Sequence, residues 1–505
     1  MKSNKSVKAF IDETNVDEMV TRLRQHLEKD GQMPVYSDIY KEENGKTYQY
    51  VNYVQEGGGV LGVALVGYTY VLEKLGFRFL KLAGTSAGAI NTIMLSSVDK
   101  KNQEAYSGYD TKSEIILHEM LHYDLWDLVD GSKFGKFFIN LFINNRFGLR
   151  ILKYLYIVLF FILVAFSIAR PFITQPEITS VLDILAVTTF FTLLVSTGIL
   201  IYYLYRFDRA GFGINPGDKF HSWITDILQR NGTPTSEALK NAMQKNFVDL
   251  KLRNDPDREP SESNTNITEP FITIIASDVT NQTKVEFPLK AEDYWDNKDA
   301  VSPADYVRAS MSIPVFFEPF TVDVPEQVIQ RSALQQSQLV GEQFDRMRSL
   351  KKETRSYPVR FVDGGILSNF PINIFHNPAI KVARMPTFGV KLEDNDHTDS
   401  DTIEKQRVKF FPFLGRIFST VRFYYDRDFL KKNAVYEKCI GHIDVAGFNW
   451  LDFGLNDEVK KQLFIKGAEA ARTFLLGGTV WIDGRESQFE AFNWKSFKKE
   501  RRAML

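Results

Sequence analysis

Residues 50–91 read YVNYVQEGGGVLGVALVGYTYVLEKLGFRFLKLAGTSAGAIN, and this stretch decides the fold. It holds two short extended runs, each of which ends in a glycine-rich turn and is followed by a helical pattern. The two turns lie about 25 residues apart, which is the length of one strand–helix–strand unit. We therefore expect an α/β protein in which the two turns face each other.

The second turn, GTSAG at residues 84–88, has the spacing of a nucleophile elbow. It follows the apolar run at 79–83 and precedes an apolar helical run, and its small flanking residues permit a strained strand-to-helix turn. Such a turn presents a serine hydroxyl above the sheet. Ser86 is therefore the candidate nucleophile.

The first turn is a candidate oxyanion hole. Gly57, Gly58 and Gly59 have no side chains to cover their backbone N–H groups. Together with the N–H of Ala87, these donors can stabilise the negative charge that develops when a nucleophile attacks an ester carbonyl.

A serine hydroxyl needs a base, and the sequence favours an aspartate over a histidine. None of the downstream histidines has a context that suggests a catalytic triad: His376, His397, His442. Asp363 ends a short strand-like run at 359–362, and the two glycines after it permit close approach of another segment. A Ser86/Asp363 dyad is the preferred interpretation, with a plain Asp-Gly turn as the alternative.

These motifs together resemble the patatin-like phospholipases in order and spacing. The resemblance covers roughly residues 48–480 and rests on these segments: GGGVLG at 57–62, GTSAG at 84–88, ASMSIPVFF at 309–317, and DGG at 363–365 with Asn369 and Pro371. It implies a three-layer α/β/α fold and lipid acyl hydrolase activity. Ser86 would be the nucleophile, Asp363 the base and the glycine loop the oxyanion hole, and no metal or other cofactor would be required.

The chain departs from the family pattern at one position. Leu61 stands in the glycine loop where the family usually has Arg or Lys. The loss of that cation bears on headgroup contacts and on catalytic rate, whereas the nucleophile and the base are both present. We therefore expect an active enzyme.

Two uncharged runs, at residues 154–169 and 184–205, have about the length that a helix needs to cross a bilayer. The short linker between them contains Pro171 and Pro176, so the pair predicts a transmembrane hairpin. A pair of buried core helices is the alternative.

Basic residues flank the hairpin on both sides: Arg146, Arg150, Lys153, Arg206 and Arg209. The linker carries Arg170 with Glu177 and Asp183. By the positive-inside rule, both soluble parts should face the cytoplasm. The sequence therefore predicts an integral membrane protein whose catalytic domain lies on the cytoplasmic side and whose substrate is a membrane phospholipid or another acyl lipid.

The motifs and the hairpin divide the chain into five segments. They are an N-terminal arm at 1–47, a first part of the patatin-like domain at 48–150, the hairpin at 151–208, a second part of the domain at 209–480 with a charged insertion at 324–356, and a basic tail at 481–505. The tail is expected to be solvated or to touch anionic lipid headgroups.

Composition excludes several classes of protein. The 505 residues carry a net charge of -1, which does not favour a general nucleic-acid binder. Cys439 is the single cysteine, so the chain has no internal disulfide and no cysteine zinc cluster. The sequence does not indicate an oligomeric state.

Two alternative functions remain open. HEMLH at 118–122 matches the H-E-x-x-H pattern, which places two imidazoles on one helical face and a glutamate between them, as in zinc metalloproteases. No third ligand stands out, so ordinary helix histidines are the simpler interpretation. The second alternative is a catalytically silent membrane scaffold on the hydrolase fold, for which Leu61 is the only support.

Overall fold

The computed structural model describes residues 6–123, 126, 130, 146–173, 175–209, 211–258, 269–329, 356–394 and 410–504. They fall into two compact units. The first is built from residues within 1–128, 218–312 and 320–505, and the second from residues within 129–217 and 313–319. The charged insertion expected at 324–356 lies mostly outside the described residues.

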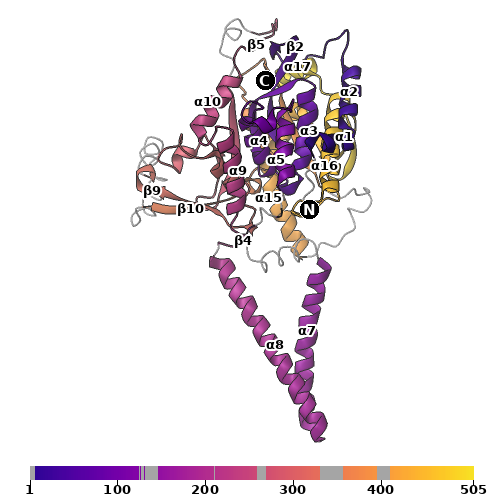
Figure 1. The fold of residues 1–505 in the computed structure, drawn as a ribbon, viewed down its shortest axis with the longest axis vertical. Helices are drawn as coiled ribbons and strands as arrows, with labels where there is room; N and C mark the ends of the chain where they lie inside the picture. Colours follow the sequence, from indigo (N-terminus) through magenta and orange to yellow (C-terminus); the bar gives the residue numbers. More distant parts are fainter. Residues whose placement is uncertain are drawn as a thin grey trace. The chain divides into compact units, whose positions relative to one another are not determined.

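A mostly parallel sheet forms the centre of the first unit (Figure 1). Its strands follow the order β12 (Ile440–Asp444), β11 (Thr387–Glu393), β2 (Lys46–Gln55), β3 (Phe77–Thr85), β6 (Phe271–Asp278), β10 (Ser356–Asp363) and β9 (Phe320–Pro325). The strands from β12 to β6 are parallel, whereas β10 is antiparallel to β6 and β9. Three further strands pair at its sides: β1 (Ile39–Glu43), β5 (Lys251–Leu252) and β7 (Thr283–Phe287). The predicted α/β class is therefore confirmed.

The register of the sheet brings three strand ends to one level. Gln55 at the end of β2 pairs with Gly84 near the end of β3. Thr85 pairs with Ile275 in β6, and the next residue of β6 pairs with Asp363, the last residue of β10. Because β10 runs antiparallel to β6, Asp363 arrives at this level from the opposite direction. The sheet therefore places the glycine loop, the elbow and Asp363 at the same edge.

Helices and short 3-10 turns cover the two faces of the sheet. On one face Tyr53 stacks on Tyr68 of α3 (Gly62–Lys74), with ring centroids 6.4 Å apart, and Phe388 contacts Phe474 of α16 (Asp457–Leu476) edge-on at 4.8 Å. Gly389 follows Phe388 and faces the other side. A Cβ on Gly389 would lie 2.4 Å from Phe370. The loop after Asp363 therefore packs on that second face.

The remaining helices of the first unit surround this framework. They are α1 (Val7–Thr14), α2 (Val16–Leu27), α4 (Ala87–Ser97), α5 (Lys112–His122), α9 (Asp218–Arg230), α10 (Ser236–Asn246), α12 (Pro303–Ser310), α15 (Phe410–Lys432) and α17 (Trp494–Met504). Two short 3-10 turns, η6 (Gly364–Ile366) and η7 (Ile372–Phe375), follow β10, and β13 (Gly478–Ile482) pairs with β14 (Arg485–Phe489).

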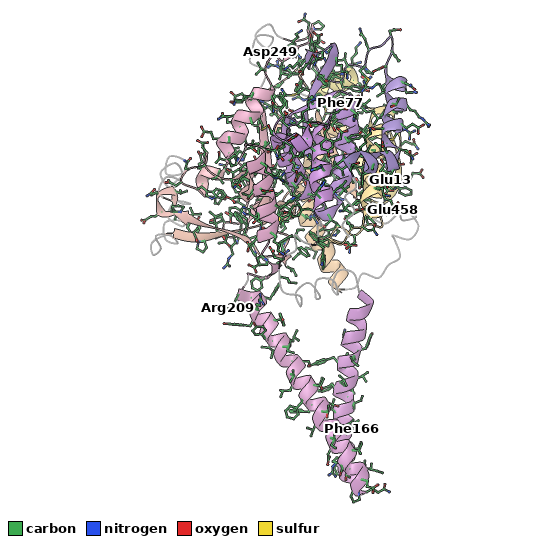
Figure 2. All side chains as sticks on the ribbon, in the orientation of Figure 1. Glu13, Phe77, Phe166, Arg209, Asp249 and Glu458 are labelled. Atoms are coloured by element: carbon green, nitrogen blue, oxygen red, sulfur yellow. The ribbon has the colours of Figure 1, made fainter. Side chains whose placement is uncertain are left out.

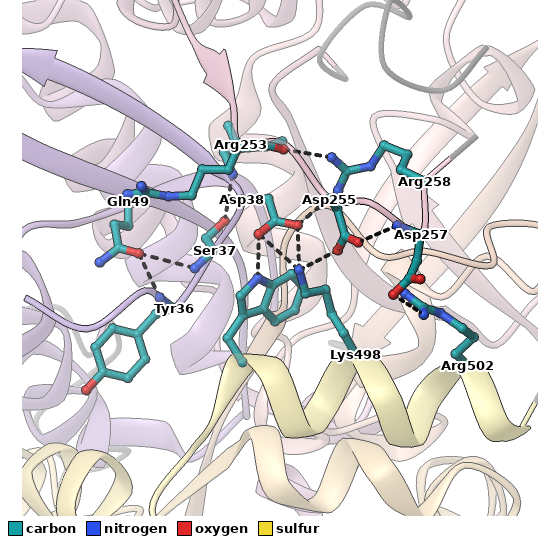
Figure 3. A network of polar contacts seen from close by, with 12 residues as sticks. Tyr36, Ser37, Asp38, Gln49, Arg253, Asp255, Asp257, Arg258, Lys498 and Arg502 are labelled. Atoms are coloured by element: carbon teal, nitrogen blue, oxygen red, sulfur yellow. Dashed lines mark hydrogen bonds and ion pairs between the residues drawn. The ribbon is translucent and has the colours of Figure 1, made fainter. Parts of the chain in front are cut away.

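The basic C-terminal segment is part of the first unit. Its last residues form α17, from which Lys498 makes ion pairs with Asp38 at 3.0 Å and Asp255 at 2.6 Å (Figure 3). Trp494 Nε1 donates to Asp38 at 2.8 Å, and Arg258 forms a buried ion pair with the same carboxylate. Carboxylates therefore hold Lys498, and the expected solvated tail is instead a docked helix, whose contact with lipid headgroups stays a prediction.

The second unit contains the two apolar helices, α7 (Arg146–Ala169) and α8 (Pro176–Arg209). Their apolar side chains project outward (Figure 2), and two stretches, Lys153–Phe172 and Pro176–Arg209, are long and apolar enough to cross a membrane. In each of them an 18-residue window has a mean hydropathy of 2.2, and no part of that window is buried. The buried core helices considered as the alternative are not observed.

Two further contacts of the second unit lie near the ends of α8. Arg170 pairs with Asp183 at 2.7 Å beside the linker. Next to the other end of α8, β4 (Gly213–Asn215) pairs in parallel with β8 (Val315–Phe317).

Candidate active site

Ser86 occupies a strained elbow between β3 and α4. Its φ of 52° and ψ of -117° lie in a region that residues other than glycine rarely adopt. The flanking glycines allow this geometry: a Cβ on Gly84 would lie 2.3 Å from the Gly88 carbonyl oxygen, and a Cβ on Gly88 would lie 2.3 Å from the Gln55 oxygen. The observed backbone is the nucleophile-elbow geometry that the sequence predicts.

Asp363 lies beside Ser86 with its carboxylate only partly satisfied. The N–H of Gly365 donates to Oδ1 at 2.7 Å, whereas Oδ2 makes no hydrogen bond of standard geometry within the described residues. Burial raises the pKa of Asp363 above its ordinary value, although the Ser86 hydroxyl, the Gly365 N–H and the Arg422 guanidinium each lower it. A carboxylate with a raised pKa is a better proton acceptor for a serine hydroxyl.

The glycine loop lies against the elbow. A Cβ on Gly57 would lie 3.1 Å from the Ser86 Cβ, so the absence of a side chain permits this approach. The Gly57 N–H donates to the Asn369 carbonyl at 3.1 Å and is therefore occupied. The N–H groups of Gly58 and Gly59 donate no backbone hydrogen bond to any residue that the structure describes, so they remain candidates as oxyanion donors.

The fourth candidate donor, Ala87, begins α4 directly after the nucleophile. At this position its N–H belongs to the first turn of the helix, where backbone donors have no partner inside the helix. The structure therefore brings all six site residues predicted from the sequence to one edge of the sheet, with Gly57 using its N–H to fix the loop.

The end of α12 and the two residues after it contact both Ser86 and Asp363, a function that the sequence does not indicate. The Ser86 N–H donates to Ser310 Oγ at 2.9 Å. Two residues later, the Ser312 carbonyl accepts from the Asp363 N–H at 2.8 Å. The motif at 309–317 is visible in the sequence. Its contacts with Ser86 and Asp363 could not be predicted, because they form only when distant segments pack together.

Two residues of α15 hold the loop that follows Asp363. Arg422 Nε donates to the Gly365 carbonyl at 2.8 Å. One turn later, Asp426 accepts from Ser368 Oγ at 2.7 Å and from the Phe370 N–H at 2.8 Å. Burial raises the pKa of Asp426 to about 6. Neither residue stands out in the sequence, because four-residue spacing of charges on a helix is common.

A second buried carboxylate lies directly before the glycine loop. Glu56 accepts from Asn369 Nδ2 at 3.1 Å and from the Leu392 N–H at 2.7 Å. Burial raises its pKa to about 7. Burial would also raise the pKa of nearby Glu393, but the hydrogen bond with His442 and the charge of Lys391 outweigh it and bring that pKa to about 2.

The H-E-x-x-H motif lies on α5, where its polar groups have protein partners. Glu119 is buried and ion paired with Arg230 at 2.9 Å. His118 Nδ1 bonds to the Tyr109 hydroxyl, and the rings of His118 and His122 lie 3.9 Å apart. The described residues contain no cluster of three or more candidate metal ligands. The geometry therefore favours ordinary helix histidines.

The fold and the site define an α/β protein with a serine elbow, an adjacent aspartate and a glycine loop. The chain belongs to the patatin-like phospholipase family, whose model matches residues 54–376. It is 26% identical over 426 residues to the uncharacterized protein YqhO of Bacillus subtilis (strain 168), covering 84% of this chain and 98% of that protein. A solved structure, VipD from Legionella pneumophila, matches with 14% identity and a TM-score of 0.32, covering 93% of this chain and 74% of that one.

Proposed function

We propose that this protein is a lipid acyl hydrolase of the phospholipase type that cleaves fatty-acyl esters of membrane lipids through a Ser86/Asp363 dyad. The observation that carries the proposal is the meeting of a strained serine with a buried aspartate of raised pKa. The glycine loop beside them supplies backbone donors. The proposal includes the three-layer α/β/α arrangement of the patatin-like fold.

The reaction has two steps. Ser86 Oγ attacks the ester carbonyl while Asp363 takes its proton, and N–H groups of Gly58, Gly59 and Ala87 stabilise the oxyanion. The alcohol part of the lipid leaves with the proton from Asp363, and the acyl chain remains on Ser86. Water then attacks the acyl-enzyme, gives a proton to Asp363 and releases the fatty acid as the proton returns to Ser86.

The hairpin supplies the location in this proposal. Two helices of membrane-spanning length and composition have exposed apolar side chains, which in water would form an unfavourable surface. The basic flanks favour a cytoplasmic position for both soluble parts. The substrate would then be taken from the inner leaflet of the membrane that holds the enzyme.

The geometry also bears on the silent-scaffold alternative. Leu61 is apolar and buried, with 1% of its surface exposed, so this position offers neither a charge nor an exposed surface to a headgroup. However, Arg422 lies close enough to lower the pKa of Asp363, so the site is not without a nearby cation. These contacts support an active enzyme over a scaffold.

Mass spectrometry of membrane lipids provides the test. Wild-type protein should release fatty acid and the matching lysolipid, whereas Ser86→Ala and Asp363→Asn should lose this activity. Ser96→Ala is the matched control, because the Ser96 hydroxyl donates to the Thr92 carbonyl within α4. Hydrolysis by Ser86→Ala at the wild-type rate would refute the assignment of the nucleophile.

A further inference from the structure

Asn369 uses one end of its side-chain amide to hold the glycine loop. Its Nδ2 donates to Glu56 Oε1 and to the Gly57 carbonyl, both at 3.1 Å. Because a carbonyl oxygen can only accept, the NH₂ end of the amide must face Gly57. This requirement fixes the direction of the other end, Oδ1.

The Oδ1 atom of Asn369 is buried and lies between two glycines. A Cβ on Gly57 would lie 2.6 Å from it, and a Cβ on Gly365 would lie 2.4 Å from it. Asn369 is 4% exposed, and within the described residues Oδ1 has no hydrogen-bond partner. Buried acceptors are rarely left without a donor, because desolvation without a hydrogen bond is unfavourable.

The Asp363 carboxylate supplies a second acceptor near the same two glycines. Its Oδ2 makes no hydrogen bond of standard geometry within the described residues, and the carboxylate loses the Ser86 hydroxyl as a donor once Ser86 is acylated. A Cβ on Gly365 would lie 2.9 Å from the other oxygen of this carboxylate, and a Cβ on Gly57 would lie 3.1 Å from the Ser86 Cβ. The two acceptors and the nucleophile therefore surround one small region. A water molecule has two O–H donors, which matches the two acceptors.

We propose that Asn369 is a catalytic residue that, with Asp363, holds the water that hydrolyses the acyl-enzyme. This inference rests on the proposed function. One O–H of the water donates to Asn369 Oδ1 and the other to Asp363. The water oxygen bonds to the acyl carbon, and its proton moves to Asp363. The bond from that carbon to Ser86 Oγ then breaks, Asp363 returns the proton to Oγ, and the fatty acid leaves.

Pre-steady-state kinetics with a soluble p-nitrophenyl ester separates this function from a purely structural one. In Asn369→Ala, deacylation should slow about tenfold more than acylation, which is the effect expected from the loss of one hydrogen bond. A burst of p-nitrophenol and an acyl adduct on Ser86 should appear. Equal slowing of both steps would overturn the proposal.

Two further variants separate the loop-holding contact from the water contact. Asn369→Asp keeps an acceptor but loses the donor, so the two steps should slow by similar factors. Glu56→Ala removes a partner of Nδ2 without touching Oδ1 and should behave in the same way. Asn373→Ala is the matched control, because Asn373 Nδ2 donates to the Tyr425 hydroxyl and does not contact the dyad.

A crystal structure of the full-length Ser86→Ala variant gives a readout that does not depend on activity. The expected result is an ordered water within hydrogen-bond distance of Asn369 Oδ1 and the Asp363 carboxylate. Its absence would overturn the assignment of Asn369 even if the protein hydrolyses lipids. If the water is ordered in Ser86→Ala but the wild-type protein has no esterase activity, the proposed function is refuted and Asn369 has no catalytic step to assist.

Discussion

Glu56 gives the protein a pH-dependent stability that one substitution should remove. In the folded chain its pKa is about 7, whereas the ordinary value is 4.5. Because the folded-state pKa is raised, this group contributes stability below pH 4.5, and that contribution is lost as the pH rises through 7. Each pKa unit corresponds to about 1.4 kcal/mol. The ionised side chain therefore destabilises the folded protein by about 3 kcal/mol above pH 7.

The Glu56→Gln substitution removes this ionisation. Glutamine can still accept one of the two hydrogen bonds, so the lost bond adds a difference that does not change with pH. Relative to wild type, the free energy of unfolding of Glu56→Gln should therefore increase by about 3 kcal/mol between pH 4 and pH 8. Denaturant unfolding of the full-length protein in detergent micelles, repeated across this range, measures the difference.

Glu393→Gln tests a neighbouring carboxylate whose pKa is shifted in the opposite direction, and Glu393 directly follows Leu392, the backbone partner of Glu56. The folded-state pKa of Glu393 is about 2, so its stabilising contribution is present above pH 4.5 and is lost as the pH falls through 2. Because the charge of Glu393 raises the pKa of Glu56, Glu393→Gln should also shift the Glu56-dependent loss of stability to lower pH and make that loss smaller. A constant difference between Glu56→Gln and wild type from pH 5 to pH 8 would refute the reasoning, because it would show that Glu56 does not titrate there.

Two further predictions concern α15 and the hairpin. Asp426→Asn can accept only one of the two hydrogen bonds from Ser368 and Phe370, so kcat on a soluble ester should fall about tenfold. Asp428→Asn is the matched control, since Asp428 pairs with Lys432 on the surface, and an equal loss in both variants would contradict the prediction. For the hairpin, a cysteine placed at Phe172, which is 83% exposed in the linker, should react with a membrane-impermeant maleimide added outside intact cells. The native Cys439 is buried and should not react; labelling of the Phe172→Cys variant only after lysis would contradict the orientation.

Much of the candidate site could be predicted from sequence because its motifs are backbone requirements. Gly84 and Gly88 are needed where a Cβ would collide with main-chain oxygens, and Ser86 lies at the strained position between them. Such requirements leave a local signature that can be recognised without a structure. The same holds for the two apolar helices, whose length and composition are visible in the chain itself.

The supporting contacts could not be predicted, because they join segments that are distant in sequence. Asn369 appears in a motif, but its contacts with Glu56 and Gly57 depend on how the loop after β10 crosses the sheet. Asp426 lies in a helix whose sequence gives no sign that it accepts from that loop. The docking of the basic C-terminal segment could not be predicted for the same reason, since its partner Asp38 lies at the other end of the chain.

The sequence by itself determined the α/β class, the family, the elbow at Ser86, the glycine loop and the two apolar helices, because each follows from local spacing, backbone sterics or local composition. The sequence suggested Asp363 as the partner of Ser86, but only the tertiary structure decided how the two residues come together. That meeting depends on the sheet register, in which an antiparallel β10 ends at the level where the parallel β3 ends. It also decided which groups hold the site in place and which acceptors remain unpaired, because burial and hydrogen-bond partners are set only when distant segments pack together.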